Sequence, residues 1–111
     1  MLDRNIERIR LIKNHCDRII EKSNNINLDE FKLNKDIQDI VLFNLLQIGE
    51  LSKSLTQEFI NKYNKVPWKQ IKGTRDVIVH GYESMNYENI YYTMKIDIAK
   101  LNDYCVEILS N

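Results

Sequence analysis

Three polar side chains with complementary chemistry lie close together in the stretch Arg-Asp-Val-Ile-Val-His-Gly-Tyr, residues 75–82. His80 can accept and donate a proton near neutral pH, because the ordinary pKa of a histidine is about 6.5. Arg75 stays cationic, and its planar guanidinium can hold two phosphate oxygens while negative charge develops on them. Tyr82 adds a hydroxyl group beside them. The three residues are therefore a candidate site for proton transfer next to a phosphate.

Arg75 and His80 can converge only if the helix that carries Arg75 ends between them. Five residues of an ideal helix turn the chain through about 500°, which leaves the two side chains roughly 140° apart. Gly81 offers a way to end this helix, because glycine readily adopts the left-handed backbone that closes many helices. We therefore expect the helix to end near Val79. His80 and Tyr82 would then lie on a turn within reach of Arg75.

The elements that position this site are predicted to be helices throughout. The chain has one proline and three glycines, which leaves long stretches without helix breakers. Apolar residues recur at helical spacing, and Asp3, Asn27 and either Ser84 or Asn86 are available as N-caps. The predicted helices cover residues 3–22, a short piece at 27–33, residues 37–59, residues 67–79, and a last helix that reaches Ile108. We predict an all-α bundle of four to five helices, with residues 1–111 forming one domain.

Several apolar side chains are predicted to face inward, and the helix predicted over 37–59 carries more of them than one narrow seam needs. They include Ile20, Phe43, Trp68, Val77 and Ile78. The excess on the 37–59 helix must be buried either within the chain or against a second copy, which favours a homodimer. Asn44 lies in the same stripe, where a hydrogen-bonded buried polar group, or a residue that sets the register of a dimer, is a better interpretation than a catalytic residue.

Charge and cysteine content narrow the possible functions. Sixteen basic and sixteen acidic side chains cancel, so a contact with a polyanion needs a local patch. Cys16 and Cys105 are far apart and are interpreted as reduced core thiols, and the pair His15–Cys16 as packing rather than as metal ligands.

The charged N-terminus has no apolar run of the kind found in signal peptides, and no segment approaches the length of apolar chain that a membrane span needs. We expect a cytoplasmic protein without membrane contact.

The segment Trp-Lys-Gln-Ile-Lys-Gly-Thr-Arg-Asp-Val-Ile-Val-His-Gly-Tyr, residues 68–82, resembles the signature of the HepT-like ribonuclease toxins of the HEPN superfamily. The resemblance extends to Gln-Ile-Gly-Glu at residues 47–50 and to the helical order of nearly the whole chain. It implies a HEPN-like bundle and an RNA endonuclease that needs neither metal nor cofactor. It also implies a homodimer whose two active sites lie close to the dimer seam.

The resemblance assigns Arg75, His80 and Tyr82 to the catalytic site. Attack of an RNA 2′-hydroxyl on the neighbouring phosphate would use His80 for proton transfer and Arg75 for the developing charge. Tyr82 would orient the phosphate or His80, or would accept AMP from a partner antitoxin, an MntA-type nucleotidyltransferase. A nucleotide on Tyr82 would compete with RNA for Arg75 and block the nuclease.

Further residues are predicted to assist without reacting. Gln47 and Glu50 match the family pattern and could support the His80 turn, although an exposed Glu is also the ordinary expectation. Asp76 and Gly81 are the other supporting candidates. Four lysines precede Arg75 at intervals of three or four: Lys62, Lys65, Lys69 and Lys72. Lys69 and Lys72 are the predicted RNA contacts, although such a run is more often a solvated surface.

Two other interpretations remain open at this point. The chain could be a non-catalytic helical subunit that binds a partner nucleotidyltransferase through the same stretch, in which case His80 would be dispensable. It could also be a structural dimer in which the polar triplet only closes a helix end. Alanine at Arg75 or His80 would then lower stability and change nothing else.

Overall fold

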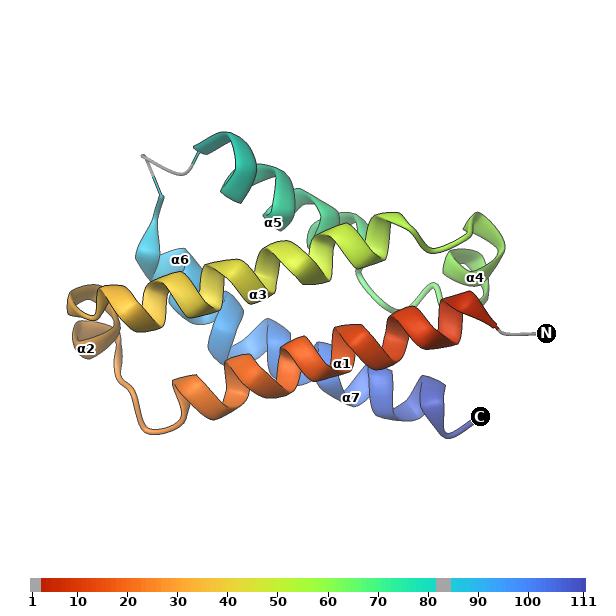
Figure 1. Ribbon diagram of the computed structural model, residues 1–111, viewed down its shortest axis with the longest axis horizontal. Coiled ribbons are helices and arrows are strands. Elements are labelled where there is room, and N and C mark those ends of the chain that lie inside the picture. The colour runs from red at the N-terminus through yellow and green to blue at the C-terminus, as the bar shows by residue number, and fades with distance from the viewer. Residues whose placement is uncertain (1–2, 82–84) are drawn as a thin grey trace.

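The computed structural model describes residues 3–81 and 85–111, and helices fill most of both ranges (Figure 1). In chain order they are α1 (Arg4–Ser23), α2 (Leu28–Leu33), α3 (Lys35–Lys53), α4 (Gln57–Lys62), α5 (Trp68–Gly81), α6 (Tyr87–Tyr92), η2 (Thr93–Asp97) and α7 (Ile98–Leu109). The last three form one continuous run, in which η2 is a π-helical turn. No strand occurs in the described ranges, so the predicted all-α class is confirmed.

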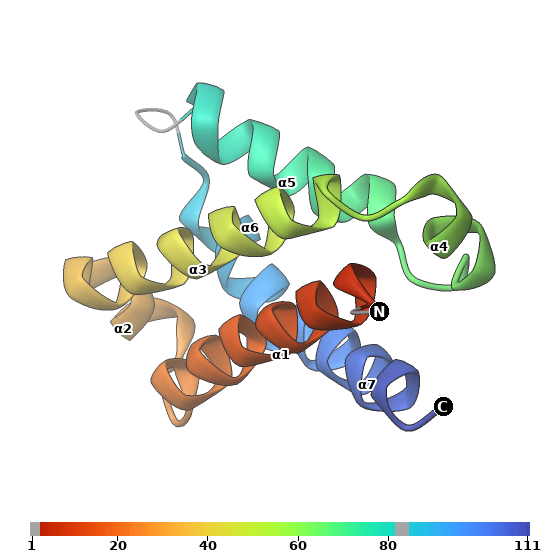
Figure 2. The same ribbon diagram turned by 45° about the vertical axis from the view of Figure 1, so that its right-hand side comes forward.

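Helix α3 is the centre of the bundle. It packs along α1 on one side and along α5 on the other, and α1 in turn packs against α7 (Figure 2). The core is formed by buried side chains from all of these helices, with Ile12, Val41, Ile48, Met94 and Cys105 among the most enclosed. Within the described ranges, no helix combines the length and the apolar character needed to cross a membrane.

Short polar side chains set the starts of several helices. Asp3 accepts hydrogen bonds from the first amides of α1, and Asn27 forms the predicted capping box with Glu30 at the start of α2. Asn86 accepts a hydrogen bond from the amide of the third residue of α6 and is the cap of that helix. Ser84, the other predicted cap, lies outside the described residues. These local patterns therefore set the helix starts as expected.

The prediction of one helix over 37–59 is wrong. Helix α3 ends at Lys53, and Phe59 belongs to α4. Thr56 starts α4, because its hydroxyl accepts a hydrogen bond from the amide of Phe59 at 3.3 Å. Asn5 of α1 fixes this start by bonding to both the amide and the hydroxyl of Thr56. The apolar spacing continues across the break because Phe59 still reaches the core, so periodicity alone could not detect it.

Three of the side chains predicted to face inward lie at the surface instead. Ile20 is 37% exposed, Phe43 is 55% exposed and Val77 is 58% exposed. Ile78, the neighbour of Val77, is 5% exposed, so α5 turns Ile78 rather than Val77 toward the core. This confirms the prediction for Ile78. Ile20 and Val77 are therefore wrong predictions. Phe43 is not buried within the chain, so of the two predicted ways to bury it only contact with a second copy stays a prediction.

Candidate active site

Arg75 lies where α5 crosses α3, and Gly49 permits the close approach of the two helices. A Cβ atom added at Gly49 would lie 2.2 Å from Cβ and 2.7 Å from Cγ of Arg75. Such distances are far shorter than real contacts between carbon atoms, so any side chain at position 49 would push the helices apart. Gly49 therefore determines how deeply the start of the Arg75 side chain sits against α3.

Two carboxylates hold the guanidinium of Arg75. Its Nε donates a hydrogen bond to Oε1 of Glu50, and its Nη1 donates one to Oδ1 of Asp76 at 2.9 Å. These hydrogen bonds, with Asp76 first and Glu50 second, raise the pKa of Arg75 above its ordinary value. The side chain is 19% exposed, so part of it stays open to a ligand. The structure thus places two predicted supporting residues, Glu50 and Asp76, in direct contact with Arg75.

His80 does not lie on a turn beyond the helix. Helix α5 continues through Gly81, so the prediction that it ends near Val79 is wrong. No described glycine has a positive φ, and the left-handed closure expected at Gly81 is not found in the described residues. Glycine permits such a closure without requiring it, and burial of Ile78 favours continuing the helix. His80 is exposed and, by helix geometry, faces roughly 140° away from Arg75.

The remaining predicted residues divide between described and undescribed parts of the chain. Tyr82 follows α5 directly in sequence and lies outside the described residues. Gln47 is half-buried on α3, one turn before Glu50. The structure thus brings Arg75, Glu50 and Asp76 together, and within one copy it leaves His80 on another side of α5.

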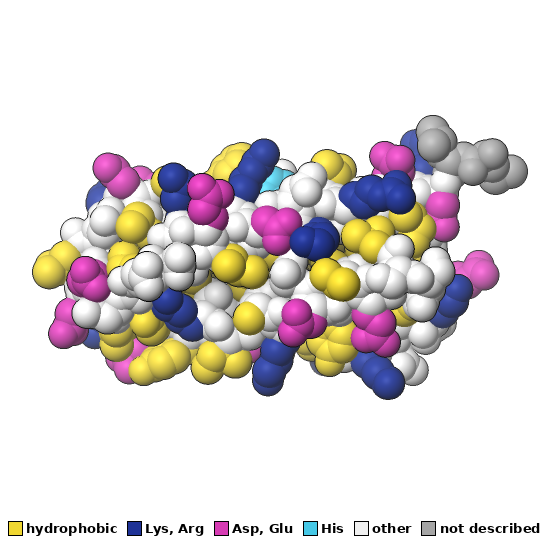
Figure 3. Space-filling model, turned by 90° about the horizontal axis from the view of Figure 1, so that it is seen from below, with side chains coloured by type: hydrophobic (Ala, Val, Ile, Leu, Met, Phe, Trp, Pro, Cys, Tyr) yellow, Lys and Arg dark blue, Asp and Glu magenta, His cyan; other side chains and the backbone are white. Residues whose placement is uncertain are grey.

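The predicted basic approach is divided between two hollows. Lys69 and Lys72 line a hollow between α4 and α5 together with Asp76, and Asp76 also binds Arg75. Lys62 and Lys65 line a different hollow, between the α4–α5 connection and α7. The four lysines do not share one helix, because α4 ends at Lys62 and α5 begins at residue 68. On the face in Figure 3, basic, acidic and apolar side chains are interspersed.

The two thiols lie in the core, and the other histidine, His15, is half-buried. Cys16 and Cys105 are buried and free, which confirms them as reduced core thiols. Burial raises the pKa of Cys105 to about 12 and also raises the pKa of Cys16. His15 Nδ1 lies 2.7 Å from Oδ1 of Asn44, whose Nδ2 donates to the carbonyl of Ile40. Asn44 is thus a hydrogen-bonded buried polar group, as predicted. In residues 3–81 and 85–111, no three His, Cys, Asp or Glu side chains form a metal-binding group.

Gly49 is the site residue that sequence reasoning missed. It lies inside the Gln-Ile-Gly-Glu motif, but no role was predicted for it. A glycine within a helix costs about 1 kcal/mol relative to alanine, so its presence there is a signal that something packs closely against it. The partner in that contact, Arg75, could not be identified without the crossing of α3 and α5.

Comparison with known proteins identifies the family of the chain. The family of ribonuclease HepT-like proteins matches residues 12–108. A protein of Caldanaerobacter subterraneus subsp. tengcongensis, provisionally named an RNase, is 36% identical over 98 residues, which cover 88% of each chain. A similarly named protein of Methanocaldococcus jannaschii is 44% identical over 73 residues, 66% of this chain and 60% of its own.

A protein of Thermococcus cleftensis, provisionally named ribonuclease HepT, is 30% identical over 83 residues, which cover 75% of this chain and 76% of its own. No solved structure matches the chain significantly. Because the family match spans most of the sequence, including both the Gly49 contact and the Arg75–His80 segment, the chain belongs to the HepT-like ribonuclease family.

Proposed function

We propose that the chain is a metal-independent RNA endonuclease and the toxin of a HepT/MntA-type toxin–antitoxin pair. Membership of the HepT-like ribonuclease family supports the RNase activity. The observation that supports the site best is the position of Arg75, whose guanidinium is hydrogen-bonded to two carboxylates, Glu50 on α3 and Asp76. An exposed His80 follows Arg75 by five residues on the same helix. RNA is the substrate, and Lys69 and Lys72 on the same helix would contact its backbone.

The proposed reaction needs a proton acceptor, a proton donor and a cation. The RNA 2′-oxygen attacks the adjacent phosphorus and loses its proton to an imidazole. The bond from phosphorus to the 5′-oxygen breaks, and that oxygen takes up a proton, which leaves a 2′,3′-cyclic phosphate and a 5′-hydroxyl. Arg75 has five N–H donors, of which Glu50 and Asp76 engage two, so three remain for the phosphate. His80 is the group assigned to the proton transfers.

The proposal includes a second copy of the chain, because Arg75 and His80 face different sides of α5 within one copy. Exposed apolar side chains on α1, α3 and α5 are available for such a contact: Leu11, Phe43 and Val79. In a symmetric dimer each surface is used twice, so an α5 helix that packs near its own copy can place His80 near the partner's cation. The homodimer would thereby assemble a site that a single copy does not contain.

Control by a partner enzyme completes the proposal. An MntA-type nucleotidyltransferase would transfer AMP from ATP to the hydroxyl of Tyr82, with release of pyrophosphate. The new phosphodiester would carry negative charge close in sequence to His80 and Arg75, and would compete with the phosphate of RNA. Mass spectrometry of the chain after incubation with ATP and the partner tests this step, with Tyr82→Phe as the variant that should stay unmodified.

The decisive experiment for the nuclease is RNA cleavage by the purified dimer in excess chelator. Wild type should cut RNA and leave cyclic phosphate ends, whereas His80→Ala and Arg75→Ala should lose about 10²–10⁴-fold in rate with an unchanged helical spectrum. Val77→Ala, an exposed change on the same helix, is the matched control and should cut RNA normally. Equal cleavage by wild type and His80→Ala would contradict the proposal.

A second candidate function is a non-catalytic helical subunit that binds the partner nucleotidyltransferase. The divergence of Arg75 and His80 within one copy favours it, because a binding surface does not need the two side chains to meet. In that case wild type would be folded and would bind the partner, yet it would leave RNA intact. His80→Ala would then behave as wild type in both assays.

A further inference from the structure

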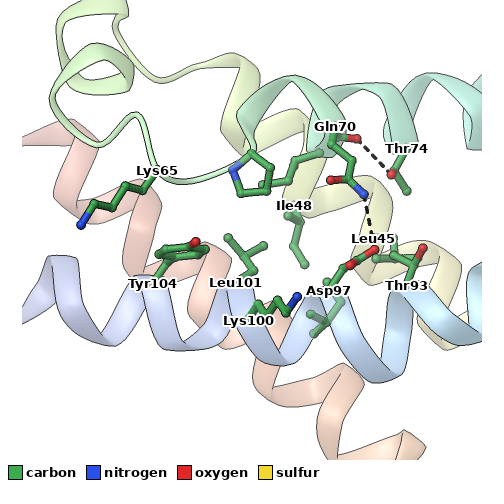
Figure 4. Close-up of a pocket in the computed structure, with 13 residues that line it drawn as sticks. Leu45, Ile48, Lys65, Gln70, Thr74, Thr93, Asp97, Lys100, Leu101 and Tyr104 are labelled. Carbon is green, nitrogen blue, oxygen red and sulfur yellow. Dashed lines mark hydrogen bonds between the residues drawn. The ribbon is translucent and has the colours of Figure 1, made fainter.

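A cavity of about 270 Å³ lies between α5 and α7. Leu45 and Ile48 of α3 form its floor, and Leu101 of α7 lines it beside them (Figure 4). Arg75 and His80 are not among the described residues that line it. Sites for drug-sized molecules occupy about 300–1,000 Å³, so this cavity suits a group as small as one nucleobase.

A π-helical turn contributes to one end of the cavity. The turn η2 interrupts the C-terminal helical run at Thr93–Asp97, and its first and last residues both line the cavity. π-helical turns are rare and occur mostly as single-turn interruptions at functional sites, because their backbone is less favourable than an α-helix. The interruption is therefore an observation, independent of the cavity itself, that points to a ligand at this place.

The side chains at this end offer hydrogen bonds of both kinds. Gln70 Nε2 donates to Oδ2 of Asp97 at 3.5 Å, the outer limit for such a bond, so an incoming group can displace it (Figure 4). Thr74 and Thr93 add hydroxyl groups to the same lining. Lys100, one helical turn after Asp97, also lines the cavity, so this end carries a cation as well as a carboxylate (Figure 4). The carboxylate of Asp97 accepts hydrogen bonds only, and it therefore favours a ligand with N–H donors.

The other end is aromatic and basic. Tyr104 and Lys65 line it, and Lys65 lies on the opposite side of the cavity from Asp97 (Figure 4). An adjoining hollow shares both residues and adds Lys62 and one acidic side chain, Glu107. Two lysines against one carboxylate leave this end cationic, which suits a phosphate group.

We propose that the cavity binds one unpaired nucleotide of the RNA substrate, with the base at Asp97 and the phosphate at Lys65. This inference rests on the proposed nuclease function and adds to it a base-reading subsite. Unpaired RNA bases are commonly recognised by aromatic stacking together with hydrogen bonds to their edges. Tyr104 lies about two helical turns from Asp97, at the Lys65 end of the cavity, and supplies an aromatic surface for the part of the nucleotide that extends from Asp97 toward Lys65.

The carboxylate of Asp97 selects guanine. Guanine presents two adjacent donors, N1–H and the 2-amino group, on its Watson–Crick edge, so it can bond to both oxygens of one carboxylate. Uracil presents one N–H between two carbonyl oxygens, which a carboxylate repels. A bidentate contact of this kind discriminates between bases by about 5- to 150-fold, so at least a roughly fivefold preference for guanine is expected.

The test is titration of the isotope-labelled full chain with 5′-GMP and 5′-UMP, followed by the chemical shifts of its backbone amides. GMP should shift the amides of η2 and of Gln70 and Tyr104 in a saturable way, and UMP should bind at least about fivefold more weakly. Asp97→Asn keeps the shape of the side chain and should abolish that difference. Asp103→Asn on the exposed side of α7 is the matched control and should keep it.

Two results would overturn the subsite. One is equal binding of GMP and UMP to wild type, and the other is GMP-induced shifts that leave η2 and Tyr104 unaffected. His80→Ala should bind GMP as tightly as wild type does. It should also bind a short RNA that contains one guanine more tightly than an all-uracil RNA of the same length. If the chain cleaves RNA in a manner that depends on His80 but does not bind GMP, the subsite is excluded and the proposed nuclease function stands. If the chain binds GMP but never cuts RNA, the proposed nuclease function is excluded.

Discussion

Gly49 of α3 faces the Cβ of Arg75 on α5 so closely that a Cβ at position 49 would lie 2.2 Å from it. The neighbour of Gly49 along α3, Glu50, accepts a hydrogen bond from the Arg75 guanidinium. Close helix packing and orientation of the cation therefore come from two consecutive residues. This arrangement joins Gly49 and Glu50 of the Gln-Ile-Gly-Glu motif to Arg75, which lies about 25 residues later in the sequence.

Gly49→Ala should lower the free energy of unfolding by about 1–3 kcal/mol, because the added methyl group overpacks the contact with Arg75. Gly73→Ala is the matched control, since a Cβ there meets no atom within 4 Å. That change should stabilise α5 by about 0.5–1 kcal/mol through helix propensity. Urea unfolding followed by circular dichroism measures both values. Equal stability of the two variants would contradict the close contact.

Glu50→Ala should lower kcat about tenfold to a hundredfold with little change in KM, because the guanidinium of Arg75 loses one of the groups that orient it. Glu50→Gln keeps an oxygen acceptor at the same place and should retain most of the activity. Steady-state cleavage of a defined RNA by both variants gives the comparison. If Ala and Gln were equivalent, Glu50 would not act through this hydrogen bond.

Mixing Arg75→Ala with His80→Ala tests whether the site is shared between two copies. If Arg75 of one copy acts with His80 of the other, each mixed dimer has one intact site, and an equal mixture should recover about a quarter of wild-type activity. Each variant alone should stay inactive. The mixture is prepared by joint refolding and assayed for RNA cleavage. No recovery from dimers that have exchanged subunits would mean that both residues act within one copy.

Neither Cys16 nor Cys105 should react with iodoacetamide in the folded protein, even at pH 9. Burial raises the pKa of Cys105 to about 12 and raises that of Cys16 as well, so the reactive thiolate is suppressed. These pKa shifts leave the free energy of unfolding unchanged below the ordinary thiol pKa of about 8.5, and they lower it as the pH rises from there toward 12, because the thiols then ionise in the unfolded chain but not in the folded one. Mass spectrometry should find no adduct on the native chain and two in denaturant. An adduct on the native chain would show that a thiol is accessible.

Local patterns in the sequence determined most of the helical framework. Asp3, Asn27 and Asn86 start helices because a short polar side chain satisfies amides only a few residues away. Burial of Cys16 and Cys105 follows from apolar spacing along their helices, and the hydrogen-bonded Asn44 follows from its place in an apolar stripe. The family resemblance was also contained in local motifs. Each of these inferences needed only residues within a few turns of one another.

The tertiary structure alone decided how the candidate site is arranged. It ended α3 before Phe59, because Asn5 from α1 holds the cap residue Thr56. It joined Arg75 to Glu50, because α5 crosses α3 at Gly49. The cavity beside η2 lies between α5, which packs mainly against α3, and α7, which packs mainly against α1. These features depend on contacts between residues distant in sequence, and the spacing of side chains along one helix does not record which helix will pack against it.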